Sequence, residues 1–152
     1  AVIERLKKAF PQAGIGADVI VGFPGETEEQ FQNTYKLMES LPLTHFHVFP
    51  YSKRKGTTAS LLKNEISKQV KKERVQKLIE LGERKLEAFA ETQVGLSNTV
   101  LFEKKNERGL WEGYSSNYLM VEVESSEDLK NQICKVIFTS AHKGTLSARL
   151  AP

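Results

Sequence analysis

Two features in the first 60 residues of this sequence have the residue types and spacing of a ligand site. The run Gly22-Phe23-Pro24-Gly25 ends an apolar, β-branched stretch, and glycines at such a point let a ligand approach the backbone closely. Its alternative role is that of a purely structural turn between a strand and a helix. Arg54 stands in a polar loop, and its planar, permanently charged guanidinium is suited to binding a carboxylate or a phosphate. A solvent-exposed basic loop is an equally good reading of Arg54.

His45 and His47 share one face of an expected strand, a spacing that a metal-binding pair can use. Only two ligands are visible there, so packing or hydrogen bonding is the favoured role and we predict no metal site. Cys134 is the single cysteine, which excludes both a disulfide within the chain and a site built from several cysteines. We expect an inert core thiol in a reducing, cytoplasmic setting.

Basic residues are concentrated in the middle of the chain. Residues 53–85 hold 11 of the 22 Lys and Arg residues but only 4 of the 19 Asp and Glu residues, although the formal net charge of the whole chain is only +3. A solvated helix face explains most such stretches, but a concentrated patch also attracts a polyanion through counterion release. Nucleic acid is therefore a candidate partner. A membrane is not, because no apolar run approaches the roughly 20 residues that span a bilayer.

The elements that would position these residues begin with an α/β unit. The pattern predicts a helix over residues 1–10 and a strand over residues 14–23, whose continuous apolar centre is typical of a parallel strand covered on both faces. A helix follows from Thr27, which forms a capping box with Gln30. A second strand over residues 44–50 completes a βαβ crossover. The expected helix stripes are Ile3, Leu6 and Phe10 in the first helix, and Phe31, Tyr35, Met38 and Leu41 in the second.

A long helix is predicted over residues 67–94, with Ser67 as its cap. Its apolar face is expected to contain Val75, Leu78, Ile79, Gly82, Leu86, Phe89 and Ala90. Gly82 costs roughly 1 kcal/mol relative to Ala in a helix interior. We expect close packing of a neighbouring backbone against Gly82 to compensate for this cost.

Short alternating runs replace the helical pattern after Gly95. Five strands are predicted, separated by turns rich in Gly, Asn and Ser, which together indicate a small β-barrel. They cover residues 99–104, 110–114, 118–124, 133–138 and 145–150. Phe102 and Phe138 are expected in the core of this barrel.

Two stretches of the sequence resemble motifs of one enzyme family. Residues 17–27 read ADVIVGFPGET and resemble the DxIVGFPGET segment of the methylthiotransferases of the radical-SAM superfamily. Residues 49–59 read FPYSKRKGTTA and resemble that family's FxYSxRxGTxA segment. The expected C-terminal barrel resembles a TRAM domain. Together these resemblances cover essentially the whole chain.

The resemblance implies a fold and a set of domains. The expected fold is α/β plus all-β: the C-terminal part of a radical-SAM (β/α) barrel followed by a small five-stranded TRAM β-barrel. Residues 1–66 would belong to the radical-SAM barrel, residues 67–95 would form a connecting helix, and residues 96–152 would form the RNA-binding TRAM barrel.

The resemblance also implies an activity and its cofactors. The family uses S-adenosylmethionine radical chemistry and two 4Fe-4S clusters to add a methylthio group to C2 of a modified adenosine next to the tRNA anticodon. Cluster-binding cysteines are missing here, since Cys134 stands alone. We therefore expect a fragment that binds no cofactor of its own and is inactive alone. The implied S-adenosylmethionine contacts are Val19, Ile20, Val21, Gly22, Phe23, Pro50, Tyr51 and Arg54.

A tRNA anticodon stem-loop is the implied partner. The expected RNA contacts combine basic residues for phosphates with aromatic residues for unpaired bases. They are Lys53, Arg54, Lys68, Lys71, Lys72, Lys104, Lys105, Arg108, Trp111, Tyr114 and Lys143, with Tyr118 as a further stacking candidate. Each aromatic residue has a core position as its alternative. We also expect the isolated chain to self-associate through its open half-barrel.

Alternatives remain open at this stage. The segment HVFPYS favours the threonylcarbamoyladenosine branch of the family, with the isopentenyladenosine branch as the near alternative. Arg54 disfavours the branch that modifies a ribosomal protein, which usually has an acidic residue there. A non-catalytic RNA-binding module and a degenerate barrel that serves as a protein scaffold are the other two readings of the whole chain.

Overall fold

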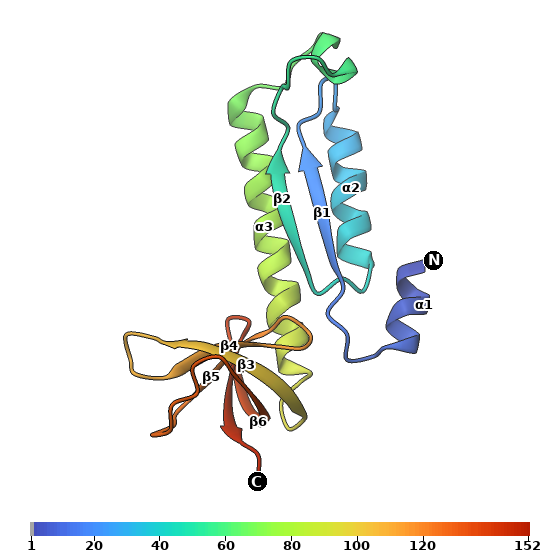
Figure 1. Cartoon of the computed structure of the whole chain (residues 1–152). Coiled ribbons are helices and arrows are strands. Elements are labelled where there is room, and N and C mark those ends of the chain that lie inside the picture. The colour runs from blue at the N-terminus through green and yellow to red at the C-terminus, as the bar shows by residue number, and fades with distance from the viewer. Residues whose placement is uncertain (1) are drawn as a thin grey trace. The chain divides into compact units, whose positions relative to one another are not determined.

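The computed structural model describes residues 2–152, which form helices and strands in the order expected (Figure 1). They divide into two compact units: one contains helix α1 (Val2–Ala9) and residues Ile15–Gly82, the other residues Phe10–Gly14 and Glu83–Pro152. No helix in the described part of the chain is both long and apolar enough for a membrane span.

The first unit is built on a βαβ crossover, as predicted. Strands β1 (Gly16–Val21) and β2 (His45–Pro50) pair in parallel, from Gly16 opposite His45 to Val21 opposite Pro50. Between them runs α2 (Glu28–Ser40). The predicted capping box begins this helix: the Gln30 backbone donates to the Thr27 hydroxyl, and the Thr27 backbone donates to the Gln30 side chain.

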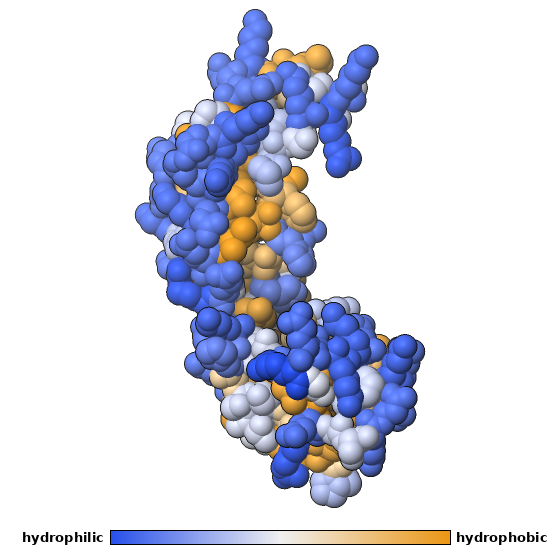
Figure 2. Space-filling model, turned by 90° about the vertical axis from the view of Figure 1, so that its left-hand side faces the viewer, coloured by the Kyte–Doolittle hydropathy of each residue, from blue (hydrophilic) through white to orange (hydrophobic). Residues whose placement is uncertain are grey.

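One face of this two-stranded sheet is covered and the other is open. Val19 and Val21 point into a core formed with α2 and α3, which includes Phe31, Met38 and Leu78. Neighbouring side chains point the opposite way, so Ile20 and Phe49, opposite each other in the register, are 61% and 49% exposed. The open apolar face agrees with the open half-barrel expected for this chain, and Figure 2 shows hydrophobic residues at the surface of the part that holds this sheet.

Helix α3 (Lys68–Glu91) begins after Ser67, whose hydroxyl accepts from the Val70 backbone as predicted. The prediction of its apolar face needs one correction, because Ile79 is exposed and Leu81 is buried instead. At Gly82 a Cβ atom would lie 3.3 Å from the ring of Phe46. The compensating neighbour is therefore an aromatic side chain and not a backbone.

Helix α1 also differs from its prediction. None of its residues is buried. Ile3 packs partly against the core of the first unit, but Leu6 and Phe10, expected on the same apolar face, are exposed.

The second unit contains the predicted five-stranded barrel. The strands are β3 (Ser97–Lys105), β4 (Trp111–Ser115), β5 (Met120–Val123), β6 (Gln132–His142) and β7 (Thr145–Leu150). They close in the order β3-β4-β5-β7-β6. All neighbours are antiparallel except β5 and β7, which pair in parallel. Closure leaves this sheet without the open edges that invite association.

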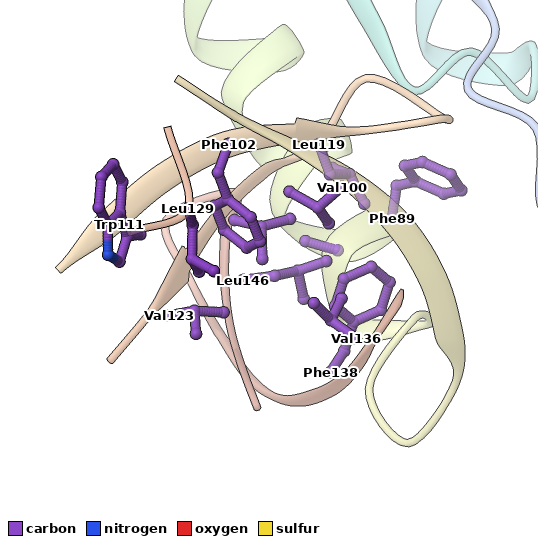
Figure 3. Close-up of a cluster of buried hydrophobic side chains, with 12 residues drawn as sticks. Phe89, Val100, Phe102, Trp111, Leu119, Val123, Leu129, Val136, Phe138 and Leu146 are labelled. Carbon is purple, nitrogen blue, oxygen red and sulfur yellow. The ribbon is translucent and has the colours of Figure 1, made fainter. Parts of the chain in front are cut away.

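Alternating residues of these strands fill the barrel interior (Figure 3). Phe102 and Phe138 are buried, as predicted, and Phe89 from α3 joins the same cluster. Trp111 also belongs to this core, with 6% of its surface exposed, and its indole N–H donates to the Glu127 carbonyl at 3.0 Å. Cys134 packs partly buried against the cluster.

Candidate ligand site at the carboxyl ends of the strands

The turn after β1 has a backbone that only glycine adopts easily. Gly22 and Gly25 have φ values of +73° and +84°. The Gly22 N–H donates to the Glu26 carboxylate at 2.7 Å, and the Gly25 N–H donates to the Asn64 carbonyl at 2.9 Å. Both contacts hold the turn at the carboxyl end of β1, where ligands bind in open α/β sheets.

A buried ion pair ties this turn to α3. Arg74 Nη1 donates to the Glu26 carboxylate at 2.5 Å and to the Glu26 carbonyl at 3.2 Å, while Nη2 donates to the Glu28 carboxylate at 3.2 Å. The side chains of Arg74 and Glu26 are only 6% and 13% exposed. Arg74 Nε is buried and has no hydrogen-bond partner within residues 2–152. The guanidinium therefore fixes the turn and the first turn of α2 against α3.

Arg74 had not been identified from the sequence. The signal that could have found it is its place on the apolar face of α3, four residues before the buried Leu78. A charged residue on such a face requires a buried partner.

Tyr51 occupies the corresponding position after β2. Its N–H donates to the Val21 carbonyl at 2.8 Å, its ring meets Phe23 edge-on at 5.2 Å, and its carbonyl accepts from Lys71 Nζ at 3.2 Å. The stem of Lys71 packs so closely on Gly22 that a Cβ atom at that glycine would collide with Lys71 Cγ. The Tyr51 hydroxyl is buried and has no hydrogen-bond partner among the described residues.

A groove of about 430 Å³ opens beside Tyr51. It is lined by Ile20, Phe49, Pro50, Tyr51, Ser52, Arg54, Thr57 and Ala59. Arg54 is exposed and is the only charged residue of that lining. A largely apolar groove with one cation suits a ligand that has a flat apolar part and an anionic group.

The structure brings together only some of the cofactor contacts implied by the sequence. Ile20, Pro50, Tyr51 and Arg54 line the groove. The side chains of Val19 and Val21 are buried in the core on the other face of the sheet. Any contact that these two residues make with a ligand in the groove would thus involve their backbone alone.

The loop that carries Arg54 is held by local contacts. Thr57 accepts from the Ser60 backbone and so caps the short 3-10 helix Thr58–Leu61. Lys53 Nζ lies 2.7 Å from the Glu65 carboxylate, and this exposed pair raises the pKa of Lys53 and lowers the pKa of Glu65. Lys53, predicted as an RNA contact, is therefore already paired within the chain.

His45 and His47 project from the open face of the sheet, with their ring centres 6.2 Å apart. Thr44 Oγ1 lies 3.0 Å from His45 Nδ1. Burial, and next the neighbouring His47, lower the pKa of His45. Across residues 2–152 no three His, Cys, Asp or Glu side chains are grouped to hold a metal ion.

The basic residues predicted to bind RNA near the β3–β4 hairpin have partners within the chain. Arg108 Nη2 lies 2.5 and 2.6 Å from the two oxygens of Glu122, and Lys104 Nζ lies 4.0 Å from the Glu112 carboxylate. Lys105 Nζ lies over the Trp111 ring, 5.1 Å from its centre. The buried position of Trp111 favours its core role over the predicted base-stacking role.

The other predicted RNA contacts differ in exposure. Tyr114, Tyr118, Lys68, Lys72 and Lys143 are exposed. Lys71 is partly buried and its ammonium is engaged at Tyr51, as described above. Lys71 does not line the groove itself but contacts Tyr51, which does.

Comparison with protein-family models gives no match for the sequence. Curated relatives do match. The chain is 39% identical over 141 residues to a threonylcarbamoyladenosine tRNA methylthiotransferase of Bacillus subtilis, which covers 88% of this chain and 31% of the relative. It is 49% identical over 83 residues to a tRNA-2-methylthio-N(6)-dimethylallyladenosine synthase of Thermobifida fusca, covering 55% of this chain and 17% of the relative.

A third relative extends the match toward the full chain. A tRNA-2-methylthio-N(6)-dimethylallyladenosine synthase of Symbiobacterium thermophilum is 36% identical over 147 residues, which is 95% of this chain and 31% of the relative. The chain thus spans about a third, or less, of the length of these relatives. Over most of its own length, it is homologous to the tRNA methylthiotransferases, and the motif-based recognition of that family is confirmed.

Proposed function

We propose that this chain is part of a tRNA methylthiotransferase that adds a methylthio group to C2 of a modified adenosine beside the anticodon. The observation that carries the proposal is the groove at the carboxyl ends of β1 and β2, because it coincides with both sequence motifs. Its lining combines Ile20, Phe49 and Pro50 with the Arg54 guanidinium. The homology to enzymes named for this modification supports the same function.

Within this proposal, S-adenosylmethionine is the cofactor that the groove accepts. The apolar wall of the groove suits the adenine ring. Arg54 can bind its carboxylate. The cofactor would supply the radical that activates the substrate carbon, while these residues bind and orient it and keep water out.

The 4Fe-4S clusters of the family do not fit the residues of this chain. A cluster is held by several thiolates, and Cys134 is the single cysteine. The proposal therefore assigns cluster binding to sequence beyond these 152 residues and expects this stretch to be inactive alone. In this proposal residues 1–66 are part of the radical-SAM barrel, residues 67–95 are a connecting helix, and residues 96–152 are a TRAM barrel. The proposed enzyme is cytoplasmic.

The favoured substrate is a tRNA that carries threonylcarbamoyladenosine. The segment from His47 to Ser52 supports this branch, as does one of the relatives. Relatives named for dimethylallyladenosine match the chain as well. The dimethylallyl substrate, of the isopentenyladenosine branch, is therefore the second candidate.

An assay of the complete gene product that contains this sequence tests the proposal. The reduced protein is incubated with S-adenosylmethionine and tRNA carrying either modified adenosine, and methylthiolated nucleosides are measured by mass spectrometry. Arg54→Ala is expected to raise the apparent KM for S-adenosylmethionine by about tenfold or more, because a charged hydrogen-bond partner is lost. Lys55→Ala is the matched control, since Lys55 is also basic but does not line the groove. Wild-type protein that forms no product from either tRNA would contradict the proposal.

A further inference from the structure

The outer surface of the barrel carries a continuous apolar row across three strands. Leu101 on β3 lies opposite Ile133 on β6 and opposite Tyr114 on β4. Opposed residues in a sheet project from the same face, and these three point away from the core. They are 42%, 73% and 45% exposed. Met120 on β5, half-buried, lies opposite Tyr114 and extends the row.

Two cations flank this row on the same side of the barrel. Lys135 on β6 lies opposite Thr99 on β3. Two residues further along β6, Ile137 lies between Ser97 on β3 and Arg149 on β7, and it is paired with both. Both cations are exposed, and neither forms an ion pair with another described residue. Together these residues form one surface, the outer β3–β6 face, made of Ser97, Thr99, Leu101, Tyr114, Ile133, Lys135, Ile137 and Arg149. None of these eight residues carries a carboxylate.

Carboxylates begin directly beyond the apolar row. Glu103 follows Leu101 by two residues on β3, and Glu112 precedes Tyr114 by two residues on β4. Glu122 on β5 lies opposite Glu112. Glu122 pairs with Arg108, and Glu112 lies 4.0 Å from Lys104. Arg108 is therefore already bound to a carboxylate.

We infer that the outer β3–β6 face binds an unpaired stretch of RNA. Tyr114 offers a ring on which a base can stack, and Leu101 and Ile133 extend the apolar platform beside it. Lys135 and Arg149 lie where they can neutralise phosphates, and the face has no carboxylate to repel the backbone. The choice of RNA as the polyanion rests on the proposed function. The position of the surface rests on exposure, register and charge alone.

This face differs from the surface that the sequence predicted. That prediction placed the barrel's phosphate contacts mainly on Lys104, Lys105 and Arg108. Arg108 must give up its Glu122 partner before it binds a phosphate, whereas Lys135 and Arg149 have no carboxylate partner among the described residues. Among the predicted contacts in the barrel, Tyr114 alone lies on the face proposed here.

Two double variants of the chain test the inference with equal changes in charge. The face variant, Lys135→Ala with Arg149→Ala, removes two cations from the outer β3–β6 face. The hairpin variant, Lys104→Ala with Lys105→Ala, removes two cations from the end of β3 that lies near Glu103 and Glu112. Binding of a fluorescein-labelled RNA stem-loop is measured by fluorescence anisotropy over a range of salt concentrations. A fully paired duplex of the stem serves as the probe without unpaired bases. Trp111 fluorescence during urea unfolding confirms that each barrel is folded.

The face variant is expected to weaken stem-loop binding by about tenfold or more. It should also reduce the slope of log affinity against log salt by about 1.4, which corresponds to two lost phosphate contacts on a single strand. Tyr114→Ala should lose roughly tenfold in affinity and Tyr114→Phe should retain it, since stacking needs the ring and not the hydroxyl. The hairpin variant should bind nearly as tightly as the wild-type chain.

Three results would overturn the inference. They are equal losses from the two double variants, tighter binding of the paired duplex than of the stem-loop, and wild-type affinity in Tyr114→Ala. Absence of stem-loop binding by the wild-type chain would also overturn it. The proposed function fails separately, through the absence of a methylthiolated product, so the two failures are distinguishable.

Discussion

The guanidinium of Arg74 on α3 donates a hydrogen bond to the carboxylate of Glu26 in the turn after β1, with 2.5 Å between Arg74 Nη1 and Glu26 Oε2. The same carboxylate oxygen accepts the Gly22 N–H at 2.7 Å. One buried carboxylate thus connects the turn that borders the candidate ligand groove to a helix 48 residues further along the chain. The turn is held in place by this contact as well as by its own glycines.

Breaking this pair should destabilise the first unit strongly. Glu26→Ala leaves the buried Arg74 without its main partner, and removal of one member of a buried pair costs about 3–5 kcal/mol. Urea unfolding followed by circular dichroism measures the loss, and hydrogen exchange of the β1 and β2 amides locates it. Glu65→Ala is the matched control because its pair with Lys53 is exposed. Such exposed pairs contribute about 0–1 kcal/mol, so equal losses in the two variants would contradict this account.

Gly22→Ala should destabilise the turn for two separable reasons. The φ of +73° costs a residue with a Cβ about 1–2 kcal/mol, and the new Cβ would collide with Lys71 Cγ. Adding Lys71→Ala to Gly22→Ala should therefore recover part of the loss but not all of it. Urea midpoints of the two single variants and the double variant measure both contributions. Full recovery in the double variant would show that the backbone conformation is not strained.

Acid should weaken the first unit through His45. Burial lowers its pKa in the folded state below the ordinary value of 6.5. Near and below pH 6.5, His45 takes up a proton more readily in the unfolded chain than in the folded chain. The free energy of unfolding therefore falls as the pH drops below about 6.5. His45→Gln should flatten this dependence between pH 7.5 and 5.5, measured by urea unfolding. Glu28 and Glu65 do not interfere, since their lowered pKa values place their titration below 4.5. An equal pH dependence in both proteins would contradict this prediction.

Self-association of the isolated chain is expected through the open sheet face. Ile20 and Phe49 are exposed there, and the two-stranded sheet pairs with no further strand among the described residues. Light scattering on the 152-residue chain should therefore detect oligomers at high concentration. Ile20→Glu with Phe49→Glu should yield monomers, whereas the same exchange at the exposed Leu61 should not. A wild-type chain that remains monomeric would contradict this prediction.

The sequence was most informative where short-range patterns decide the structure. The Thr27–Gln30 capping box, the Ser67 cap and the five barrel strands follow from residue types within a few positions. The parallel pairing of β1 with β2 also follows, because a strand–helix–strand unit has few ways to pack.

Long-range contacts explain what the sequence did not predict. Arg74 is buried because Glu26 meets it across 48 positions, and no local pattern encodes that contact. The parallel pairing of β5 with β7, which helps to close the barrel, likewise depends on the whole chain. Trp111 and Tyr114 are three positions apart on β4, so strand alternation places them on opposite sides of the barrel wall. Only the closed barrel shows that the Trp111 side faces the core and the Tyr114 side is exposed.

The most direct test of the central claim uses tRNA from cells that lack the gene containing this sequence. Nucleosides from digested tRNA are compared by mass spectrometry with those of the parent strain and of the deletion strain complemented with the complete gene. The account predicts that one 2-methylthio nucleoside disappears, that its precursor without the methylthio group accumulates, and that complementation restores the modification. Threonylcarbamoyladenosine as the precursor would support the favoured branch, and dimethylallyladenosine would identify the alternative. Unchanged 2-methylthio nucleosides in the deletion strain would contradict the account.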